Sequence, residues 1–207
     1  ESTQNIELIG EFVIGKPRDV FVSGDYAYVS AGEVFAVVDI SDPAMPVRSG
    51  YCKTPGTANG IYVSGDYAYV ADSGEGLRVI DIADPASPAE VGYYDTPGEA
   101  LAVYVSGNYA YVSDGYAGLR IIDISDPVSP AEAGYYDTPG YARDVYVTGD
   151  YAYVADDHKG LRVVDISDPM LPVEVGYYNT PGIANGVHVA DDYAYVAGER
   201  FGLQIID

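Results

Sequence analysis

The stretch VYVSGNYAYVSDGYAGLRIIDISDPVSPAEAGYYDTPG (residues 103–140) contains four short runs of strand-forming residues. They are VYVSG (103–107), YAYVSD (109–114), GLRIIDISDP (118–127) and PAEAGYYDTPG (130–140). Val, Ile and Tyr favour strands, whereas Gly, Pro, Asn and Asp favour the turns between them. The stretch therefore predicts four consecutive antiparallel strands joined by short turns.

The same pattern occurs five times along the chain. Phe21, Tyr62, Tyr104, Tyr146 and His188 share one repeat position, at intervals of 41, 42, 42 and 42 residues. Residues 61–102 and 103–144 are identical at 29 of 42 positions. Repeats of this length are typical of propeller blades or helical arrays, and the strand chemistry excludes helices. We predict an all-β fold, a five-bladed β-propeller of four-stranded blades.

The two ends of the chain suggest how the ring closes. The segment IELIGEFVIG (6–15) resembles the last strand of a unit, such as PAEVGYYDTPG (88–98), and the final unit lacks this strand. We predict that residues 6–15 join the C-terminal blade and close a monomeric ring without exposed edges. Residues 1–207 are then one domain, with repeats at 20–60, 61–102, 103–144, 145–186 and 187–207.

Composition excludes several classes of partner. The formal net charge of −22 repels nucleic-acid phosphates and anionic lipid surfaces. No apolar run approaches the roughly 20 residues of a membrane-spanning helix. We therefore expect no nucleic-acid partner and no membrane insertion. With two histidines and no hydrolase or phosphate-binding motif, we expect neither an enzyme nor a resident cofactor. Calcium, or another cation held by Asp19 and Asp144, stays open as an alternative.

Five segments then carry a family resemblance: FAVVDISDP (35–43), LRVIDIADP (77–85), LRIIDISDP (119–127), LRVVDISDP (161–169) and LQIID (203–207). They resemble LVIVD repeats, and the similarity covers nearly the whole chain. The resemblance implies a propeller from a bacterial or archaeal exported or cell-surface protein. It implies no defined reaction and no family-wide catalytic residues.

Comparison of the repeats with one another separates constant loops from variable ones. The turns SGDY, SGNY, TGDY and ADDY and the SDPxxP turns barely change, whereas the second-to-third strand loops and the connections between blades vary. In a propeller the two variable sets share one face. The candidate ligand-binding residues are Arg18, Asp19, Asn59, Glu99, Tyr116, Tyr141, Arg143, Asp144, His158, Asn185 and Arg200.

A second pattern is predicted to be structural. Asp72, Asp114 and Asp156 each precede an arginine by six residues, namely Arg78, Arg120 and Arg162. In the first and last units both partners are absent together. Charge that is gained and lost as a set predicts an ion pair that fixes each hairpin, rather than a catalytic acid.

These observations favour a non-enzymatic interaction or structural propeller that binds a protein or glycan through its variable face. Unconstrained drift of surface loops is the competing explanation of the variation. A multivalent lectin is the first alternative function, since repeated Tyr, Asp and Asn suit sugars. The second alternative is a carbohydrate-active enzyme. Its acid and base would be carboxylates at the mouth of the central channel, such as Asp19, Asp144 or Glu99.

Overall fold

The computed structural model describes residues 8–207, which form antiparallel sheets and contain no helix. Three consecutive sheets, the second, third and fourth blades, have the predicted four strands. The second blade contains β4 (Gly60–Ser64), β5 (Tyr67–Ala71), β6 (Leu77–Asp81) and β7 (Ala89–Tyr94). The third contains β8 (Ala102–Ser106), β9 (Tyr109–Ser113), β10 (Leu119–Asp123) and β11 (Ala131–Tyr136). The fourth contains β12 (Asp144–Thr148), β13 (Tyr151–Ala155), β14 (Leu161–Asp165) and β15 (Val173–Tyr178).

The first and fifth blades depart from this plan in different ways. The first blade contains β1 (Pro17–Ser23), β2 (Tyr26–Asp39) and β3 (Val47–Ala58). The Ile40 N–H donates to the Asp25 carbonyl at 2.8 Å, so the two ends of β2 lie side by side and β2 folds back on itself. It thus fills two strand positions. The fifth blade contains only β16 (Ala184–Ala190), β17 (Tyr193–Gly198) and β18 (Gly202–Ile206).

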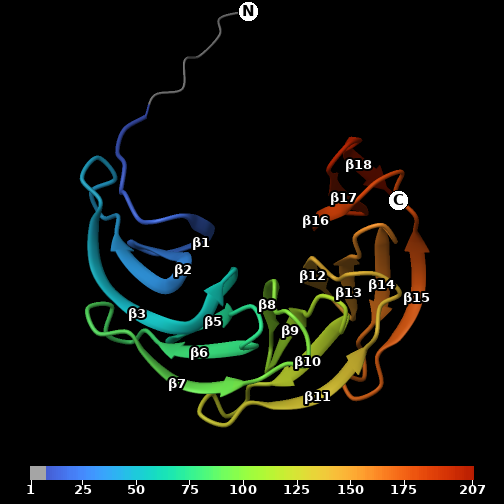
Figure 1. Cartoon of the computed structure of the whole chain (residues 1–207), viewed down its shortest axis with the longest axis horizontal. Helices are drawn as coiled ribbons and strands as arrows, with labels where there is room; N and C mark the ends of the chain where they lie inside the picture. The colour runs from blue at the N-terminus through green and yellow to red at the C-terminus, as the bar shows by residue number, and fades with distance from the viewer. Residues whose placement is uncertain (1–7) are drawn as a thin grey trace, which may run out of the picture.

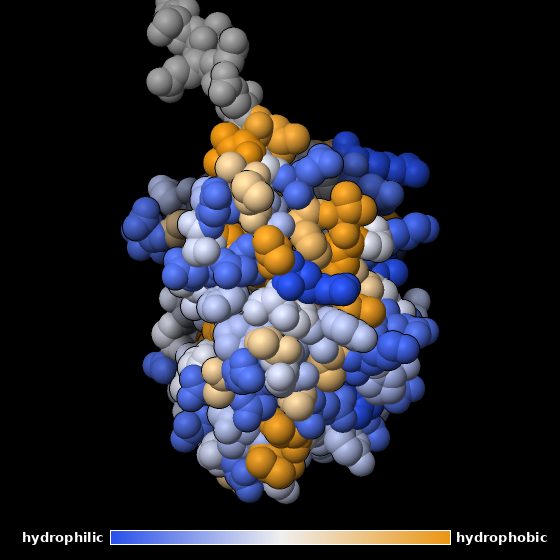
Figure 2. All heavy atoms as spheres, turned by 90° about the vertical axis from the view of Figure 1, so that its left-hand side faces the viewer, coloured by the Kyte–Doolittle hydropathy of each residue, from blue (hydrophilic) through white to orange (hydrophobic). Residues whose placement is uncertain are grey.

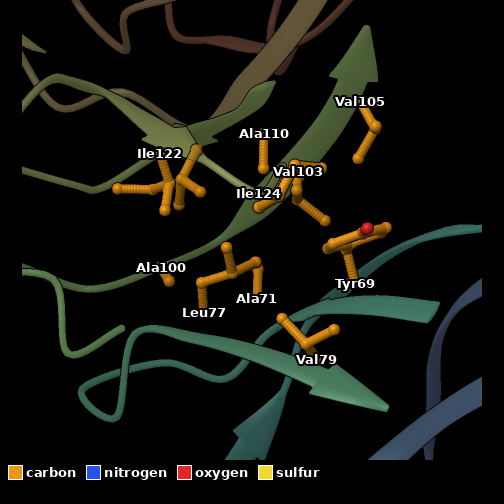
Figure 3. Close-up of a cluster of buried hydrophobic side chains, with 11 residues drawn as sticks. Tyr69, Ala71, Leu77, Val79, Ala100, Val103, Val105, Ala110, Ile122 and Ile124 are labelled. Carbon is orange, nitrogen blue, oxygen red and sulfur yellow. The ribbon is translucent and has the colours of Figure 1, made fainter. Parts of the chain in front are cut away.

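The five blades follow one another along an arc, with the first strand of each blade toward its inside (Figure 1). The core consists of layers between successive blades. In one of these, Tyr69, Leu77 and Val79 of the second blade face Val103, Val105 and Ile122 of the third (Figure 3). Each layer removes large apolar side chains from water, so neighbouring blades stabilise one another.

The repeated Asp residues of the constant turns hold those turns by local hydrogen bonds. The Asp81 carboxylate accepts from the Ala83 N–H at 2.9 Å, and Asp84 accepts from the Ala86 N–H at 3.0 Å. At the equivalent residues Asp39 and Asp165, hydrogen bonds from Ser41 and Ser167 lower the carboxyl pKa. The constant sequence of these turns therefore reflects turn chemistry.

The same turns also receive the outer strand of the preceding blade. A Cβ at Gly92 of β7 would collide with the carbonyl of Pro127, in the SDPxxP turn of the next blade. Gly50 and Gly134 meet Pro85 and Pro169 in the same way. A register shift in the pairing of each outer strand lies beside the glycine. Glycine is required here because the strand lies directly against the neighbouring backbone.

The predicted closure of the ring is not seen in the structure. Residues 8–16 lie in no strand, β18 pairs only with β17 within residues 8–207, and residues 6 and 7 lie outside the described residues. The end blades lie apart, on either side of the opening of the arc (Figure 1). Gly10 lies instead against Pro43 and Pro46 of the first blade. The N-terminal segment therefore occupies the place that an outer strand takes in the other blade pairs.

Candidate functional site

The variable loops and the connections between blades lie on one face because backbone bridges join them. Ser73 pairs with Ala100, Gly115 with Ala142, and Asp157 with Ala184. We call this side, with the loops 73–75, 115–117, 157–159 and 199–201, the variable face. The constant turns are joined to one another at the opposite ends of the strands, as in the 2.8 Å bond from Ile82 N to Asp66 O. We call that side the constant face.

Three of the variable loops share one backbone conformation. Ser73, Gly115 and Asp157 occupy the same loop position with φ values of 55°, 56° and 49°, in the left-handed region. A glycine with φ near 76° closes each loop, as at Gly118. These loops therefore present different side chains from the same backbone conformation.

The inner ends of the blades converge at a shallow cavity at the mouth of the channel. One position from each of the five blades lines this cavity of about 240 Å³: Arg18, Asn59, Leu101, Arg143 and Asn185. Below it, aromatic rings from successive blades are in contact, with centroids 4.9 Å apart for Tyr62–Tyr104 and 4.6 Å for Tyr146–His188. His188, the last member of this series, is exposed.

Asp19 and Asp144 connect neighbouring blades. The Asp19 carboxylate accepts from Val20 N and from Ile61 N of the next blade, both at 2.8 Å. Asp144 accepts from Val145 N and Val187 N, both at 2.9 Å. Burial raises the pKa of Asp144, although these two N–H groups oppose the shift. Both oxygens of each carboxylate are thus engaged by the backbone.

Five of the predicted site residues lie in or beside one cluster on the third and fourth blades. Tyr141 donates a hydrogen bond to Glu99, and its ring lies 5.2 Å from the Arg143 guanidinium. Arg143 in turn donates to Asp157 at 2.8 and 3.1 Å, and His158 lies 3.5 Å from the other oxygen of Asp157. Burial, followed by the bond to Glu99, raises the pKa of Tyr141 to about 12. The phenol therefore stays a neutral donor at physiological pH.

Exposed aromatic and basic side chains surround this cluster. Tyr116 is 84% exposed, and its ring meets Tyr141 edge-on with centroids 4.7 Å apart. Tyr116, Tyr141, Asp157, His158 and Lys159 line a cavity of about 200 Å³. His158 also borders a second cavity of about 290 Å³, with Arg200 and Phe201. The two cavities are thus neighbours on the variable face.

Sequence reasoning missed three contributors to this surface. Asp157, Lys159 and Phe201 lie in loops recognised as variable, but they are not among the predicted site residues. The aspartate positions Arg143, a contact that sequence spacing does not reveal. The signal was the change of residue type at one loop position from repeat to repeat, as in Glu75, Ala117, Lys159 and Phe201.

The structure contains two of the three predicted Asp–Arg ion pairs, in the second and fourth blades. The Arg78–Asp72 and Arg162–Asp156 contacts are long, at 3.9 and 3.6 Å, and within residues 8–207 Arg120 forms no ion pair with Asp114. Each arginine also stacks on a tyrosine of the outer strand, as Arg120 does on Tyr135 at 4.5 Å.

The buried aspartates also bind the connection that leaves the preceding blade. Asp114 accepts from Thr96 Oγ1 at 2.6 Å and from Gly98 N at 2.8 Å, both in the connection that leaves the second blade. Asp156 and Thr138 repeat the side-chain contact at 2.7 Å. Burial raises the pKa of all three aspartates, with the hydrogen bonds opposing it. The T-P-G segment that leaves one blade is therefore joined to the next blade by the buried aspartate of that blade.

Metal clusters and membrane-spanning helices are two further features relevant to function, and neither occurs in the part of the chain that the structure describes. Within residues 8–207, no group of three or more His, Cys, Asp or Glu side chains is arranged to hold a metal ion. In that same part of the chain, no helix has the length and apolar character to cross a membrane.

Comparison with known proteins identifies the repeat. The model of the LVIVD repeat matches five times, at residues 14–54, 55–96, 97–138, 139–180 and 181–207. No curated protein matches the sequence.

Several solved structures, one of them a β-propeller domain, are similar to this fold at low sequence identity. The β-propeller domain of Cps50 (Swd1) from Myceliophteria thermophila has a TM-score of 0.78 at 12% identity, covering 96% of this chain and 67% of that one. A functionally unknown protein from Desulfotomaculum acetoxidans DSM 771 has a TM-score of 0.77 at 13% identity, covering 91% and 65%. The computationally designed Ika8 protein has a TM-score of 0.73 at 9% identity, covering 91% and 57%. The chain thus spans 57% to 67% of these three structures.

Proposed function

The chain belongs to the LVIVD repeat family, and on that premise we propose that it is a non-enzymatic binding propeller. Its variable face recognises a partner, and the blades hold the recognition loops in place. The proposal includes the extracellular or cell-surface location that the family resemblance implies.

One observation carries this proposal: exposed aromatic and basic side chains gather on the variable face of the third to fifth blades. In a chain of net charge −22, Arg143, His158, Lys159 and Arg200 lie on or beside two adjoining cavities. Tyr116 and Phe201 contribute exposed rings at the same place. Aromatic residues and arginine are enriched in protein interfaces, where they supply contact area and directed hydrogen bonds.

The charges favour a protein partner with acidic groups. Arg143 is neutralised by Asp157, whereas among residues 8–207 neither Lys159 nor Arg200 forms an ion pair. An acidic side chain of a partner can pair with these two cations, while the rest of the strongly acidic surface repels the partner from other orientations.

A glycan is the second candidate, and the Tyr116 ring is the observation that favours it. The ring is 84% exposed and meets the ring of Tyr141, whose hydroxyl donates a hydrogen bond to the Glu99 carboxylate. A flat ring with polar groups at its border suits a sugar, which offers an apolar face and hydroxyl groups.

We favour binding over catalysis because of the hydrogen bonds that the Asp19 and Asp144 carboxylates make at the mouth of the channel. Each oxygen of Asp19 and Asp144 accepts a backbone N–H, one from its own strand and one from the inner strand of the next blade. Their positions therefore follow from blade packing, which gives no need for a second role as acid and base.

The test uses two panels, a displayed library of random peptides and a glycan array. The combined variant Tyr116→Ala, Lys159→Ala, Arg200→Ala is compared with Met45→Ala, Val128→Ala, Met170→Ala, which alters equally exposed side chains on the constant face. We expect ligands selected with the natural chain to bind the first variant at least about tenfold more weakly, a loss of about 1.4 kcal/mol. Binding to the control should be unchanged.

Two results would overturn the proposal. One is a set of ligands whose affinity is lost only in the constant-face control. The other is the absence of any selected ligand from both panels, which would favour unconstrained drift as the origin of the variable loops.

A further inference from the structure

An exposed tyrosine recurs on the outer strand of the second, third and fourth blades. These residues are Tyr93 on β7, Tyr135 on β11 and Tyr177 on β15, and each is 52% to 63% exposed. The outer strands lie along the outside of the arc (Figure 1), so the three tyrosines follow its outer edge. They lie within strands, so the local turn chemistry that explains the constant loops does not explain why this position stays tyrosine.

Each of these rings lies on a nearly buried arginine of the adjacent strand. The guanidinium carbon is 4.7, 4.5 and 4.9 Å from the ring centre in the second, third and fourth blades, for the pairs Arg78–Tyr93, Arg120–Tyr135 and Arg162–Tyr177. The arginines themselves are only 4% to 9% exposed. Because a buried guanidinium covers one side of each ring, the other side faces solvent in an orientation that is fixed before any ligand binds.

The first blade makes the same contact with a different arginine. Its repeat equivalent of Arg78 is Ala36, yet Arg48 of β3 lies 5.1 Å from the ring of Tyr51, which is 52% exposed. All four outer strands that the structure describes therefore carry an exposed tyrosine on an arginine, although two different positions supply the arginine. The constant feature is the supported ring and not one particular pair of residues.

A polar side chain accompanies each ring in the second to fourth blades, two residues further along the chain. Asp95 and Asp137 each accept a hydrogen bond from the arginine with one carboxylate oxygen, at 3.0 and 2.9 Å, and Asn179 accepts one at 3.2 Å. Among residues 8–207, the second oxygen of each aspartate accepts no hydrogen bond, and the two side chains are 64% and 66% exposed. A flat ring beside a free acceptor suits a sugar, whose apolar face packs on the ring while a hydroxyl donates to the carboxylate.

The charges at this edge favour a neutral sugar. Glu90, Glu132 and Glu174 lie 3.7 to 4.0 Å from the three arginines, which also contact the polar side chains described above. The arginines are therefore neutralised within the protein and offer no free cation to an acidic sugar. The net charge of −22 repels an anionic polymer further.

The outer side of the molecule is poorly suited to a protein partner. In the lower half of Figure 2, most of this surface is hydrophilic and hydrophobic residues form small separate groups. Protein interfaces instead have a continuous core from which water is excluded. A ligand that itself repeats can place one unit on each ring, because the rings occur once per blade.

We propose that Tyr93, Tyr135 and Tyr177 form three equivalent platforms that bind a neutral polysaccharide along the outer edge of the arc. Each ring packs on the face of one sugar unit, and the neighbouring Asp or Asn side chain forms hydrogen bonds with its hydroxyl groups. Binding to a single platform is weak, and one polymer that occupies several platforms binds more tightly. These platforms share no residue with the site on the variable face.

The test measures binding to three insoluble neutral polysaccharides: microcrystalline cellulose, chitin and curdlan. The fraction of protein left in solution is recorded over a series of polysaccharide amounts. We expect the natural chain to bind at least one of the three. The combined variant Tyr93→Ala, Tyr135→Ala, Tyr177→Ala should bind it at least about a hundredfold more weakly, because the gain from several sites is lost. The corresponding triple Tyr→Phe variant keeps the rings and should stay within about threefold of the natural chain.

Two controls alter exposed side chains elsewhere. Met45→Ala, Val128→Ala, Met170→Ala on the constant face and Tyr116→Ala on the variable face should both leave polysaccharide binding unchanged. Circular dichroism checks that every variant is folded. If the triple alanine variant is not folded, the three single alanine variants replace it, and each should lose severalfold in affinity.

Four results would overturn the proposal. They are no binding of the natural chain to any of the three polysaccharides, equal binding by the triple alanine variant, and an equal loss in the alanine and phenylalanine variants. The fourth is a loss in Tyr116→Ala alone, which would assign the sugar to the variable face. Failure of the outer platforms leaves the proposed function untouched, since that function is tested with substitutions at Tyr116, Lys159 and Arg200.

Discussion

The interface between the second and third blades and the two end faces, which are the sides of the first and fifth blades that meet no other blade within residues 8–207, have almost the same side chains but opposite exposure. Val105 is 6% exposed inside the molecule, whereas its repeat equivalent Val22 is 59% exposed at the end. Leu77 is fully buried, whereas Leu203 is 60% exposed. The residue type is the same in each position, and only the presence of a neighbouring blade differs. In a repeat protein, burial is thus a property of the pair of blades and not of the single repeat.

The largest expected effect is on the free energy of unfolding, when an aspartate replaces a valine between two blades or on an end face. Val105→Asp should lower the free energy of unfolding by about 3 kcal/mol or more, because it buries an unpaired carboxylate between blades. Val22→Asp should change it by less than about 0.5 kcal/mol. Urea unfolding measures both. Equal costs at the two positions would mean that the end face of the first blade is covered as well.

An intermediate effect is expected for a methyl group added to the outer strand. In Gly92→Ala the new Cβ meets the Pro127 carbonyl, so we expect a loss of about 1–3 kcal/mol. Gly176 is the matched position in the fourth blade, where a Cβ would meet only Val163, at 3.8 Å. Gly176→Ala should therefore be within about 0.5 kcal/mol of the natural chain. A large cost at Gly176 would contradict the view that the next turn is the source of the constraint.

The smallest effect concerns pH and the buried aspartates, which the end blades replace with Ala31 and Gly198. Burial raises the pKa of Asp114 in the folded chain above its ordinary value of 3.8. The folded state then binds its proton more readily than the unfolded state, so this group makes stability fall as pH rises from 3.8 through the folded pKa. Asp114→Asn should flatten the dependence of the melting temperature on pH in that window.

Acidification reduces the overall charge of the natural chain and of the Asp114→Asn variant alike. The difference between their curves of melting temperature against pH therefore isolates the effect of Asp114. Parallel curves for the natural chain and the variant would contradict a raised pKa at this site.

The sequence was sufficient for the all-β fold, the number of blades and the positions of the strands in the second, third and fourth blades. It was also sufficient to separate the loops into two faces, because the repeats can be compared with one another and constant turns follow from local chemistry. The mouth positions Arg18, Asn59, Leu101, Arg143 and Asn185 converge on one cavity for the same reason. Any set of equivalent positions lies at equivalent places around the arc.

Contacts between blades are where sequence reasoning reached its limit. Asp114 and Arg120 lie on one hairpin, and their joint loss in other repeats suggested a direct pair, whereas Asp114 binds Thr96 and Gly98 of the preceding blade. Asp19 and Asp144 were predicted only as candidate ligand residues, and sequence spacing gave no sign that both connect inner strands of neighbouring blades. Spacing along the chain reports partners within one repeat, and these partners lie in another.

What the sequence by itself determined is therefore the repeat: its strands, its turns and the residues that each blade offers to its neighbours. Only the tertiary structure decided how far the blades turn around the axis and which faces remain without a neighbour. The physical reason is one of scale. Turn and strand preferences act over a few residues, whereas the curvature of the arc is the sum of four packed interfaces, and a small angle in each decides whether the two ends meet.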